Sequence, residues 1–322
     1  MSTLDKTVFV DSQFLNDSIA GLSQHPKRLQ SKYFYDKTGD RIFQQIMEMP
    51  EYYLTRAEMD IMKTQSAQIA DVLELDGSPF DLFELGAGDA SKSVHLLKTL
   101  LERDIAFTYY PIDISANVIA GLNSSLPRLL PKLDFQGLEG DYFAMLKEVT
   151  DRSKRRKVVL FMGANIGNMH PEEAVAFCQS LSKTFSGQDR LIIGFDLKKN
   201  PDQVLKAYND ASGITRDFNL NLLRRMNREL GADFEVNAFE HYASYNPESG
   251  ACKSYLISLH EQRVLIGDTL ITFEQNEYIL MEISQKYSLE DISRLALNSG
   301  FVAEKYFSDS QGYFVDALWK LT

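Results

Sequence analysis

Short apolar runs alternate with amphipathic stretches through the middle of the chain. Residues 80–86 (FDLFELG), 107–115, 157–163 and 190–196 are nearly continuous apolar runs, which is typical of buried strands. Between the first two runs, residues 90–104 carry apolar side chains at helical spacing. Because strands that alternate with helices form parallel sheets covered on both faces, this pattern predicts an α/β fold.

The rhythm changes after Asp196 and returns near the carboxyl end of the sequence. Residues 202–230 form a long amphipathic helical region, and the apolar or alternating runs KSYLISLH, RVLIGDTLITF and YILMEIS follow it closely, as in an inserted α+β element. Residues 289–321 then predict a helix, a strand, a tight turn and a last strand that completes the sheet. We therefore predict an α/β domain formed by 60–197 and 288–322, and a second, α+β domain formed by 1–59 and 198–287.

Composition and charge narrow the class of protein. The chain has 322 residues, of which 44% are hydrophobic and 25% charged, so it is long enough for two domains and ordinary for a globular protein. The net charge of −11 argues against a nucleic-acid partner, since proteins that bind a phosphate backbone carry a basic face. The sequence leaves the oligomeric state open and is compatible with a monomer.

The same residues set expectations for the compartment. The first segment, MSTLDKTVFVDSQFLND, contains acids and no long apolar run, so we expect neither a signal peptide nor a membrane anchor. The cysteines, Cys178 and Cys252, lie far apart, which favours a reducing compartment, the cytoplasm. The histidines show no short ligand spacing, and no metal site is implied.

The first predicted strand ends in E-L-G-A-G, which contains Glu84, Gly86 and Gly88. Glycines there let the backbone turn sharply and approach a ligand, so nucleotide binding is one interpretation and a plain strand-to-helix turn is the other. Position 91 is Ser where a dinucleotide fingerprint has a third glycine, which weakens the case for NAD. S-adenosylmethionine has no pyrophosphate, and its carboxylate could lie at the start of the next helix beside Lys92.

Two further acids follow the next two predicted strands. Asp113 ends the second strand, where a carboxylate can accept hydrogen bonds from both ribose hydroxyls. The run LDFQGLEGD (133–141) predicts a third strand and its turn, and Asp141 at its end could receive an adenine amino group while Tyr142 packs on the ring, although a turn or helix cap is the commoner role for such a residue. Together with Glu84, these acids favour adenosine binding at the carboxyl edge of the sheet.

The fourth strand ends in F-M-G-A-N-I-G-N, which places Asn165 and Asn168 at the same edge. Each amide can donate and accept, which suits the zwitterionic head group of an amino acid. A turn rich in Asn and Gly explains the run equally well.

The chain resembles a known family in several long runs. KYFYDKTGDRIFQQIMEMPEYYLTR, LFELGAGDASKS, VVLFMGANIGNM, GFDLKKN, AYNDASGITRDFNLNLLRRMNRELGADF, FEH and MEISQKY look like the histidine-specific Nα-methyltransferases of ergothioneine biosynthesis, which use S-adenosylmethionine. The resemblance spans about residues 25–322. It implies a Rossmann-like class I methyltransferase sheet with helices on both faces, plus an α+β substrate-binding domain.

The resemblance also implies roles for single residues. Those that would hold the cofactor are Gly86, Lys92, Asp113 and Asp141. Those that would surround the substrate amine and carboxylate are Tyr35, Tyr52, Asn168 and Tyr208, with Tyr35, Tyr52 and Asn168 orienting the reacting amine. Glu282 and Ser284 would bind the two imidazole nitrogens. From the residues alone, the tyrosines suit an aromatic core and Glu282 and Ser284 suit solvent-facing strand positions.

The sequence departs from the family pattern at two predicted substrate contacts. Ser254 stands where well-known members have a methionine, and Asn165 replaces a hydroxyl residue. The implied reaction is trimethylation of the α-amino group of L-histidine to hercynine, and both departures leave room for another amino acid such as tryptophan. A non-catalytic module that binds S-adenosylmethionine and, more weakly supported, a nicotinamide oxidoreductase are the competing functions.

Overall fold

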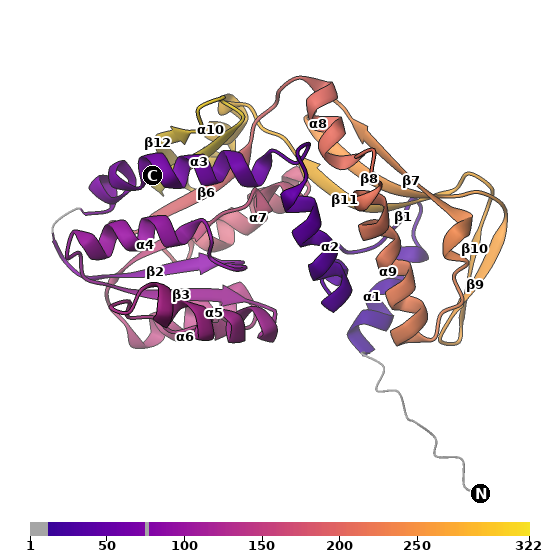
Figure 1. Cartoon of the computed structure of the whole chain (residues 1–322), viewed down its shortest axis with the longest axis horizontal. Coiled ribbons are helices and arrows are strands. Elements are labelled where there is room, and N and C mark those ends of the chain that lie inside the picture. The colour runs from indigo at the N-terminus through magenta and orange to yellow at the C-terminus, as the bar shows by residue number, and fades with distance from the viewer. Residues whose placement is uncertain (1–11, 75–76) are drawn as a thin grey trace, which may run out of the picture. The chain divides into compact units, whose positions relative to one another are not determined.

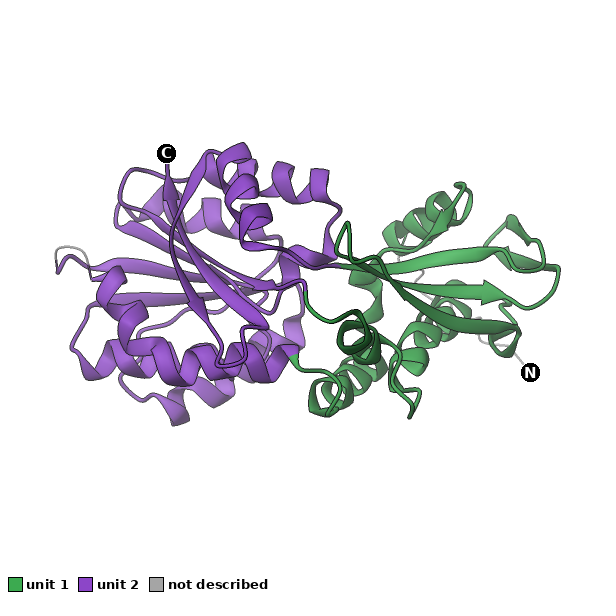
Figure 2. Ribbon diagram, turned by 90° about the horizontal axis from the view of Figure 1, so that it is seen from above, with its two compact units in different colours: residues 1–53, 199–284 green, residues 54–198, 285–322 purple. Residues whose placement is uncertain are grey.

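The computed structural model describes residues 12–74 and 77–322, and the chain forms two compact units (Figure 2). Unit 1 comprises residues 1–53 and 199–284, and unit 2 comprises residues 54–198 and 285–322. The segment in which no signal peptide or anchor is expected lies mostly in 1–11, outside the described residues. Within the described residues no helix is both long and apolar enough to cross a membrane.

The first boundary between the units lies ahead of helix α3 (Leu54–Leu73), whereas the sequence places it at residues 59 and 60, inside that helix. The buried face of α3, which includes Ile61, Met62 and Ile69, packs against strands of unit 2. A helix packs as one rigid rod, so all of α3 belongs with the sheet that its apolar stripe covers.

Within the described residues, unit 2 is built on a seven-stranded sheet in the order β12-β13-β6-β5-β2-β3-β4 (Figure 1). Its strands are β2 (Phe80–Leu85), β3 (Phe107–Asp113), β4 (Leu138–Glu139), β5 (Arg156–Phe161), β6 (Arg190–Asp196), β12 (Phe301–Ser308) and β13 (Phe314–Leu321). The strands from β6 to β4 are parallel, and β13 runs antiparallel to both of its neighbours. The predicted third strand is reduced to the two residues of β4.

Helices cover both faces of this sheet. The remaining helices of unit 2 are α4 (Ser93–Glu102), α5 (Ala116–Leu129), α6 (Tyr142–Arg152), the 3-10 turn η2 (Asn165–Asn168), α7 (Pro171–Ser182) and α10 (Leu289–Asn298). Helices α6, α7 and α10 share one apolar core with the sheet, around Phe161, Phe195 and Trp319. Helices α3 and α4 lie side by side on the other face (Figure 1).

Unit 1 is an α+β unit whose described residues form a four-stranded sheet, in the order β1-β11-β8-β7, and a separate hairpin. The sheet strands are β1 (Lys27–Arg28), β7 (Phe239–Tyr245), β8 (Ala251–Ser258) and β11 (Tyr278–Gln285), whose last residue belongs to unit 2, and the hairpin joins β9 (Gln262–Ile266) to β10 (Thr269–Phe273). The helical segments are α1 (Ser12–Leu22), η1 (Ser31–Phe34), α2 (Lys37–Glu48), α8 (Pro201–Tyr208), α9 (Ile214–Leu230) and η3 (Val236–Ala238). Helix α9 supplies much of the core, through Phe218, Leu222 and Met226.

The region that the sequence predicts as one long helix, 202–230, consists of the two helices α8 and α9. Asp210 ends the first and caps the second, since its side chain accepts hydrogen bonds from the backbone N–H groups of Ile214 at 2.9 Å and Thr215 at 2.8 Å. Gly213, with φ of +73°, supplies the left-handed residue at the break.

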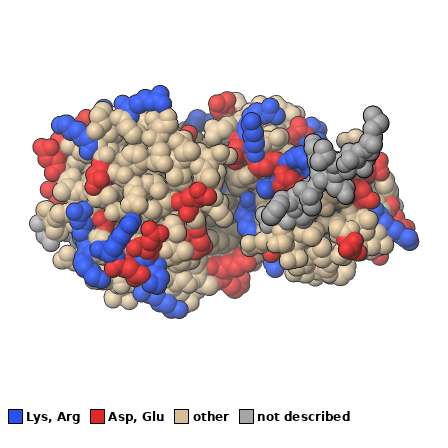
Figure 3. Space-filling view, turned by 90° about the horizontal axis from the view of Figure 1, so that it is seen from below, with Lys and Arg blue, Asp and Glu red and all other residues tan. Residues whose placement is uncertain are grey.

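Surface charge is mixed. On the face drawn in Figure 3, basic side chains are interspersed with acidic ones. Both cysteines, Cys178 in unit 2 and Cys252 in unit 1, are buried and are not joined in a disulfide.

Candidate active site

The carboxyl edge of the parallel strands is where unit 2 gathers most of its predicted site residues. Strand β2 is hydrogen-bonded to β3 on one side and β5 on the other, so the chain order reverses at β2. In open α/β sheets, ligands bind at such a reversal, outside the carboxyl ends of the strands. The turns that follow β2, β3 and β5 therefore form the candidate cofactor site.

Gly86 is the closest point of approach between these turns. Its φ is +72°, and a Cβ atom there would lie 2.8 Å from the Tyr142 hydroxyl and 3.2 Å from Asn165 Nδ2. The structure thus brings together three residues predicted separately, from the turns after β2, β4 and β5. Position 86 requires a glycine for two reasons: the backbone is left-handed there, and no space is left for a Cβ atom.

A second glycine in the same place, Gly163, was not among the predicted site residues. Its φ is +77°, and a Cβ atom there would lie 3.5 Å from Lys92 Nζ and 3.6 Å from Asn165 Nδ2. The G-A-N run after β5 could have indicated Gly163, because a glycine directly after a buried strand allows close approach of the backbone. Gly86 and Gly163 leave a cradle that side chains would fill, which is what a ligand held against main chain needs.

Asp113 lies at the end of β3, half-buried, and braces the turn after β2. Its carboxylate accepts hydrogen bonds from the backbone N–H of Ser115 at 2.9 Å and of Gly88 at 3.4 Å. Burial raises the pKa of this carboxyl above its usual value. Each carboxylate oxygen has a further lone pair, so the group can also accept a hydroxyl.

Asp141 performs the commoner role foreseen for it. Its Oδ1 accepts hydrogen bonds from the N–H groups of Phe143 at 3.0 Å and Ala144 at 3.1 Å, which caps helix α6. The cap fixes where α6 begins, and thereby places Tyr142 beside Gly86. Burial raises the pKa of the Tyr142 hydroxyl to about 12, so this group remains a hydrogen-bond donor at neutral pH.

Glu84 is buried at the end of β2, and the expectation that it contacts the cofactor stays a prediction. Only 2% of this residue is exposed, and its carboxylate accepts hydrogen bonds from the Ser93 hydroxyl at 2.6 Å and from the Tyr109 hydroxyl. Burial raises the pKa of Glu84 to about 7. Glu84 alternates along β2 toward the face covered by α3 and α4, so it supports the glycine turn from beneath.

Lys92 forms an ion pair with a residue that the sequence did not suggest, Glu58 on α3. Glu58 is fully buried, and its carboxylate also accepts a hydrogen bond from the backbone N–H of Gly163, at 2.7 Å to Oε1. The sequence feature that could have indicated Glu58 is its position on the apolar face of a helix, between Ala57 and Ile61. An acid in such a position is rarely buried without a partner.

The two predicted amides of unit 2 differ in environment. Asn165 is half-buried and adjoins Gly86 and Gly163, whereas Asn168, at the other end of η2, is exposed. Ala164 enters this turn with φ of +57°, a conformation uncommon for a residue with a side chain.

The predicted substrate residues of unit 1 form a connected aromatic group. The ring of Tyr35 lies 5.5 Å from that of Phe43, which lies 6.5 Å from Tyr52, which in turn lies 6.3 Å from Tyr208. The Tyr208 hydroxyl shares a 2.7 Å hydrogen bond with Ser284 Oγ. Phe43, which links the tyrosines, was not predicted because nothing in its sequence context separates it from an ordinary core residue.

Ser254, a predicted substrate contact, lies on strand β8 of unit 1, and its role stays a prediction. Ser254 is 2% exposed and alternates along β8 with the same face as Leu256, which belongs to the unit 1 core. Glu282 follows Met281, a member of the same core, and therefore lies on the opposite face of the sheet. Because side chains alternate along a strand, a shift of one residue along β8 moves a side chain to the other face of the sheet.

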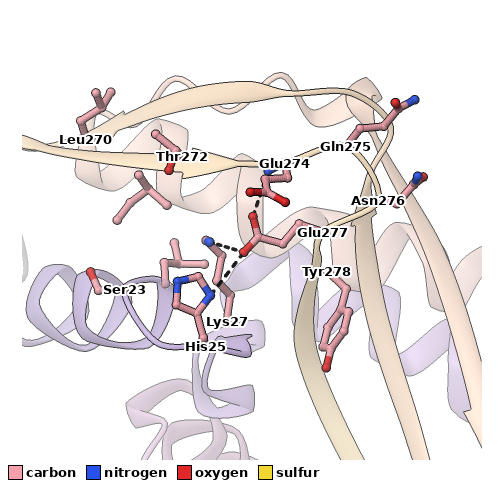
Figure 4. Close-up of a pocket in the computed structure, with 12 residues that line it drawn as sticks. Ser23, His25, Lys27, Leu270, Thr272, Glu274, Gln275, Asn276, Glu277 and Tyr278 are labelled. Atoms are coloured by element: carbon pink, nitrogen blue, oxygen red, sulfur yellow. Dashed lines mark hydrogen bonds and ion pairs between the residues drawn. The ribbon is translucent and has the colours of Figure 1, made fainter.

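A separate cavity of about 700 Å³ in unit 1 contains none of the predicted residues (Figure 4). Its wall includes an ion pair between Lys27 and Glu277, with His25 Nδ1 3.7 Å from the same carboxylate. Lys27 is buried and its ammonium lies over the ring of Phe273. The pair ties β1 to the start of β11, which is a structural role.

The sheet order of unit 2, with its antiparallel strand β13, its glycine turn after β2 and its acid after β3, is that of the class I methyltransferase fold expected from the sequence, whose cofactor is S-adenosylmethionine. The cradle of Gly86 and Gly163 and the carboxylate of Asp113 fit that cofactor. Residues 14–321 match the family of histidine-specific, S-adenosylmethionine-dependent methyltransferases, and the chain belongs to this family. Among residues 12–74 and 77–322, no three or more His, Cys, Asp or Glu side chains are arranged so that they could hold a metal ion.

The relatives of this chain include proteins named for different activities. A histidine N-alpha-methyltransferase from Mycolicibacterium smegmatis is 33% identical over 92% of this chain and 92% of its own length. Ergothioneine biosynthesis protein 1 from Schizosaccharomyces pombe is 30% identical over 91% of this chain and 39% of its own, longer sequence. An L-tryptophan methyltransferase from Psilocybe serbica is 26% identical over 92% of this chain and 89% of its own length.

Proposed function

We propose that this protein transfers methyl groups from S-adenosylmethionine to the α-amino group of L-histidine, three times in succession, to give hercynine. Unit 2 binds the cofactor in this proposal, and unit 1 binds the amino acid. The observation that carries the choice of histidine is the hydrogen bond between Tyr208 and Ser284. Glu282 lies two residues before Ser284 on the same strand, β11.

An imidazole needs partners of two kinds. One ring nitrogen donates a hydrogen bond and the other accepts one when the ring is neutral. The Glu282 carboxylate accepts only, and the Ser284 hydroxyl can donate, so the pair satisfies both nitrogens. An indole has one donor and no ring acceptor, which would leave the hydroxyl of this pair unused.

The aromatic group of unit 1 suits an amine that gains charge as it is methylated. When bound, S-adenosylmethionine supplies the methyl group, which the amine nitrogen takes as the carbon–sulfur bond breaks, with one proton leaving the nitrogen at each of three transfers. Tyr35 and Tyr52 present ring faces and hydroxyl groups that can orient the nitrogen lone pair. The Tyr35 side chain, 42% exposed, is open to a ligand. Asn168 remains a proposed contact of the same amino group.

In unit 2, the residues proposed to hold the cofactor are Gly86, Gly88, Lys92, Asp113, Asp141 and Tyr142. Asp113 would bind the ribose hydroxyls, and Asp141 and Tyr142 the adenine, in line with their places after β3 and β4. Asn165, which adjoins Gly86, would contact the substrate amino group.

The direct test is incubation of the purified protein with S-adenosylmethionine and each amino acid in turn, with products read by mass spectrometry. We expect a product three methyl groups heavier than histidine. Methylation of tryptophan in place of histidine would contradict the proposed substrate while keeping the family. Cofactor binding without any turnover would support a non-catalytic binding module.

The role of the tyrosines has its own test. The double variant Tyr35→Phe, Tyr52→Phe keeps both rings and removes both hydroxyls, so we expect kcat with histidine to fall at least about tenfold, with cofactor affinity unchanged. Tyr278→Phe is the matched control, because Tyr278 is an exposed tyrosine of unit 1 on the wall of the separate cavity. Unchanged turnover of the double variant would remove Tyr35 and Tyr52 from the mechanism.

A further inference from the structure

A buried polar cluster lies directly beneath the two glycine turns of unit 2. It contains three carboxyl groups, Glu58 from α3, Glu84 from β2 and Asp316 from β13, and one ammonium group, that of Lys92. All three acids are buried on the face of the sheet that α3 and α4 cover. A buried carboxylate is costly unless it is paired or protonated, so the division of charge within this cluster decides what each acid does.

Glu58 is the acid that touches both turns. It pairs with Lys92, at the start of α4, and accepts the backbone N–H of Gly163 at 2.7 Å to Oε1 and 3.0 Å to Oε2. The space for it exists because residue 194 on β6 is a glycine, whose Cβ would collide with Glu58 Oε1. One carboxylate thus joins the turn after β2 to the turn after β5.

The other two acids do not compete for Lys92. Both oxygens of Glu84 are engaged by the hydroxyls of Ser93 and Tyr109. Asp316 has no hydrogen-bond partner for either oxygen among the described residues, and burial raises its pKa well above the usual range. With one ammonium among three buried carboxyl groups, Glu58 is the counter-ion of Lys92, and burial favours the protonated form of Asp316.

We propose that Glu58 is a positioning residue for the cofactor: it holds Lys92 and the Gly163 amide in place so that the turns after β2 and β5 form one rigid cradle. This inference rests on the proposed function only in that unit 2 binds S-adenosylmethionine. It requires nothing about which amino acid is methylated. Glu58 acts through the groups that it holds and does not itself contact the ligand.

The test is the affinity for S-adenosylhomocysteine, measured by calorimetry at pH 7 without amino acid. Glu58→Gln keeps an acceptor for the Gly163 amide and removes the charge, so we expect affinity to fall at least about tenfold because the buried Lys92 loses its counter-ion. The KM for histidine at saturating cofactor should stay within about threefold. A lower melting temperature with unchanged affinity would show a merely structural role and overturn the proposal.

Two further variants give the proposal its matched controls. Asp316→Asn replaces an acid whose oxygens have no hydrogen-bond partner among the described residues by an amide of the same shape, so affinity should stay within about twofold, and a tenfold loss would contradict the assignment of Glu58 as the counter-ion of Lys92. Lys92→Met combined with Glu58→Gln should cost no more than the worse single change, because the two residues act as a unit. Additive losses would overturn the inference.

The outcomes separate this inference from the proposed function. If wild-type protein fails to bind S-adenosylhomocysteine, the proposed function fails. If it binds and the Glu58 variants bind equally well, only the inference fails. Should Glu58→Gln not fold, Glu58→Asp retains the charge on a shorter side chain, and we expect an intermediate affinity; wild-type affinity for that variant would count against positioning.

Discussion

The two units position their candidate site residues by different means. In unit 2 the determinants are main-chain turns, in which Gly86 and Gly163 have left-handed conformations. The carboxylate of Asp113 accepts a hydrogen bond from the first turn, at Gly88, and that of Glu58 accepts one from the second, at Gly163. In unit 1 the determinants are side chains that pack on one another, from Tyr35 through Tyr52 to Tyr208. A backbone site tolerates almost no added atom, whereas an aromatic group keeps its ring packing when a hydroxyl is lost.

The units also differ in how they respond to pH. Glu84 in unit 2 is a buried acid whose pKa is raised to about 7, mainly by burial. His241 in unit 1 is a half-buried base whose pKa is lowered to about 4, mainly by that partial burial. Folding therefore suppresses charge in both units, and the cost of that suppression appears at opposite ends of the pH range.

The largest expected effect comes from adding one carbon to the cradle. Gly86→Ala places a Cβ on a left-handed residue and within 2.8 Å of the Tyr142 hydroxyl. We expect affinity for S-adenosylhomocysteine to fall at least about 30-fold, or about 2 kcal/mol, by calorimetry. Gly231→Ala at the end of α9 is the control, since φ there is +64° and nothing lies within 4 Å of the added atom. Equal cofactor affinities for the two variants would refute the close-approach argument.

The next largest effect is the pH dependence of stability. Folded Glu84 keeps its proton to about pH 7 while the unfolded chain loses it near pH 4.5, so stability falls by about 2 kcal/mol between pH 5 and 8 on this account. Glu84→Gln should remove that alkaline loss. Folded His241 stays neutral to about pH 4 while the unfolded chain gains a proton near pH 6.5, so His241→Gln should remove a similar loss between pH 7 and 5.

Urea unfolding at pH 5, 7 and 8 distinguishes these two groups. Each variant should differ from wild type most at its own end of the range. A shift in unfolding free energy that is the same at every pH would mean that packing, and not ionisation, explains the change.

The smallest expected effect is on the side-chain group of unit 1. Tyr208→Phe removes one hydrogen bond and keeps the ring, so the KM for histidine should rise about fivefold, or about 1 kcal/mol. Ser284→Ala should cost more, because it also removes a proposed imidazole contact. Two results together would contradict the role of the Tyr208–Ser284 hydrogen bond in ordering the pocket. The KM for histidine would be unchanged by Tyr208→Phe in the wild-type background, and it would be lowered by Tyr208→Phe in the Ser284→Ala background.

Much of the fold was predictable because the strands of unit 2 are continuous apolar runs. The glycine turn and Asp113 were predictable for a related reason, since residues at strand ends share one edge of a parallel sheet. Glu58 and Phe43 were not, because their roles depend on contacts between segments distant in the sequence. The face of the sheet on which Ser254 lies could not be predicted either, because a shift of one residue along a strand reverses the face.

The pairing of β1 with β11 has a consequence for synthesis. Lys27 stands opposite Ile279 in the register and its ammonium binds Glu277, 250 residues later in the chain. At about 5–20 residues per second, the ribosome delivers that partner roughly 12–50 s after Lys27. All of residues 54–198 emerge in the interval, so the first segment of unit 1 must wait for its sheet while the strands from β2 to β6 are already made. A nascent chain of this protein therefore exposes an unfinished edge to chaperones until its last strands of unit 1 arrive.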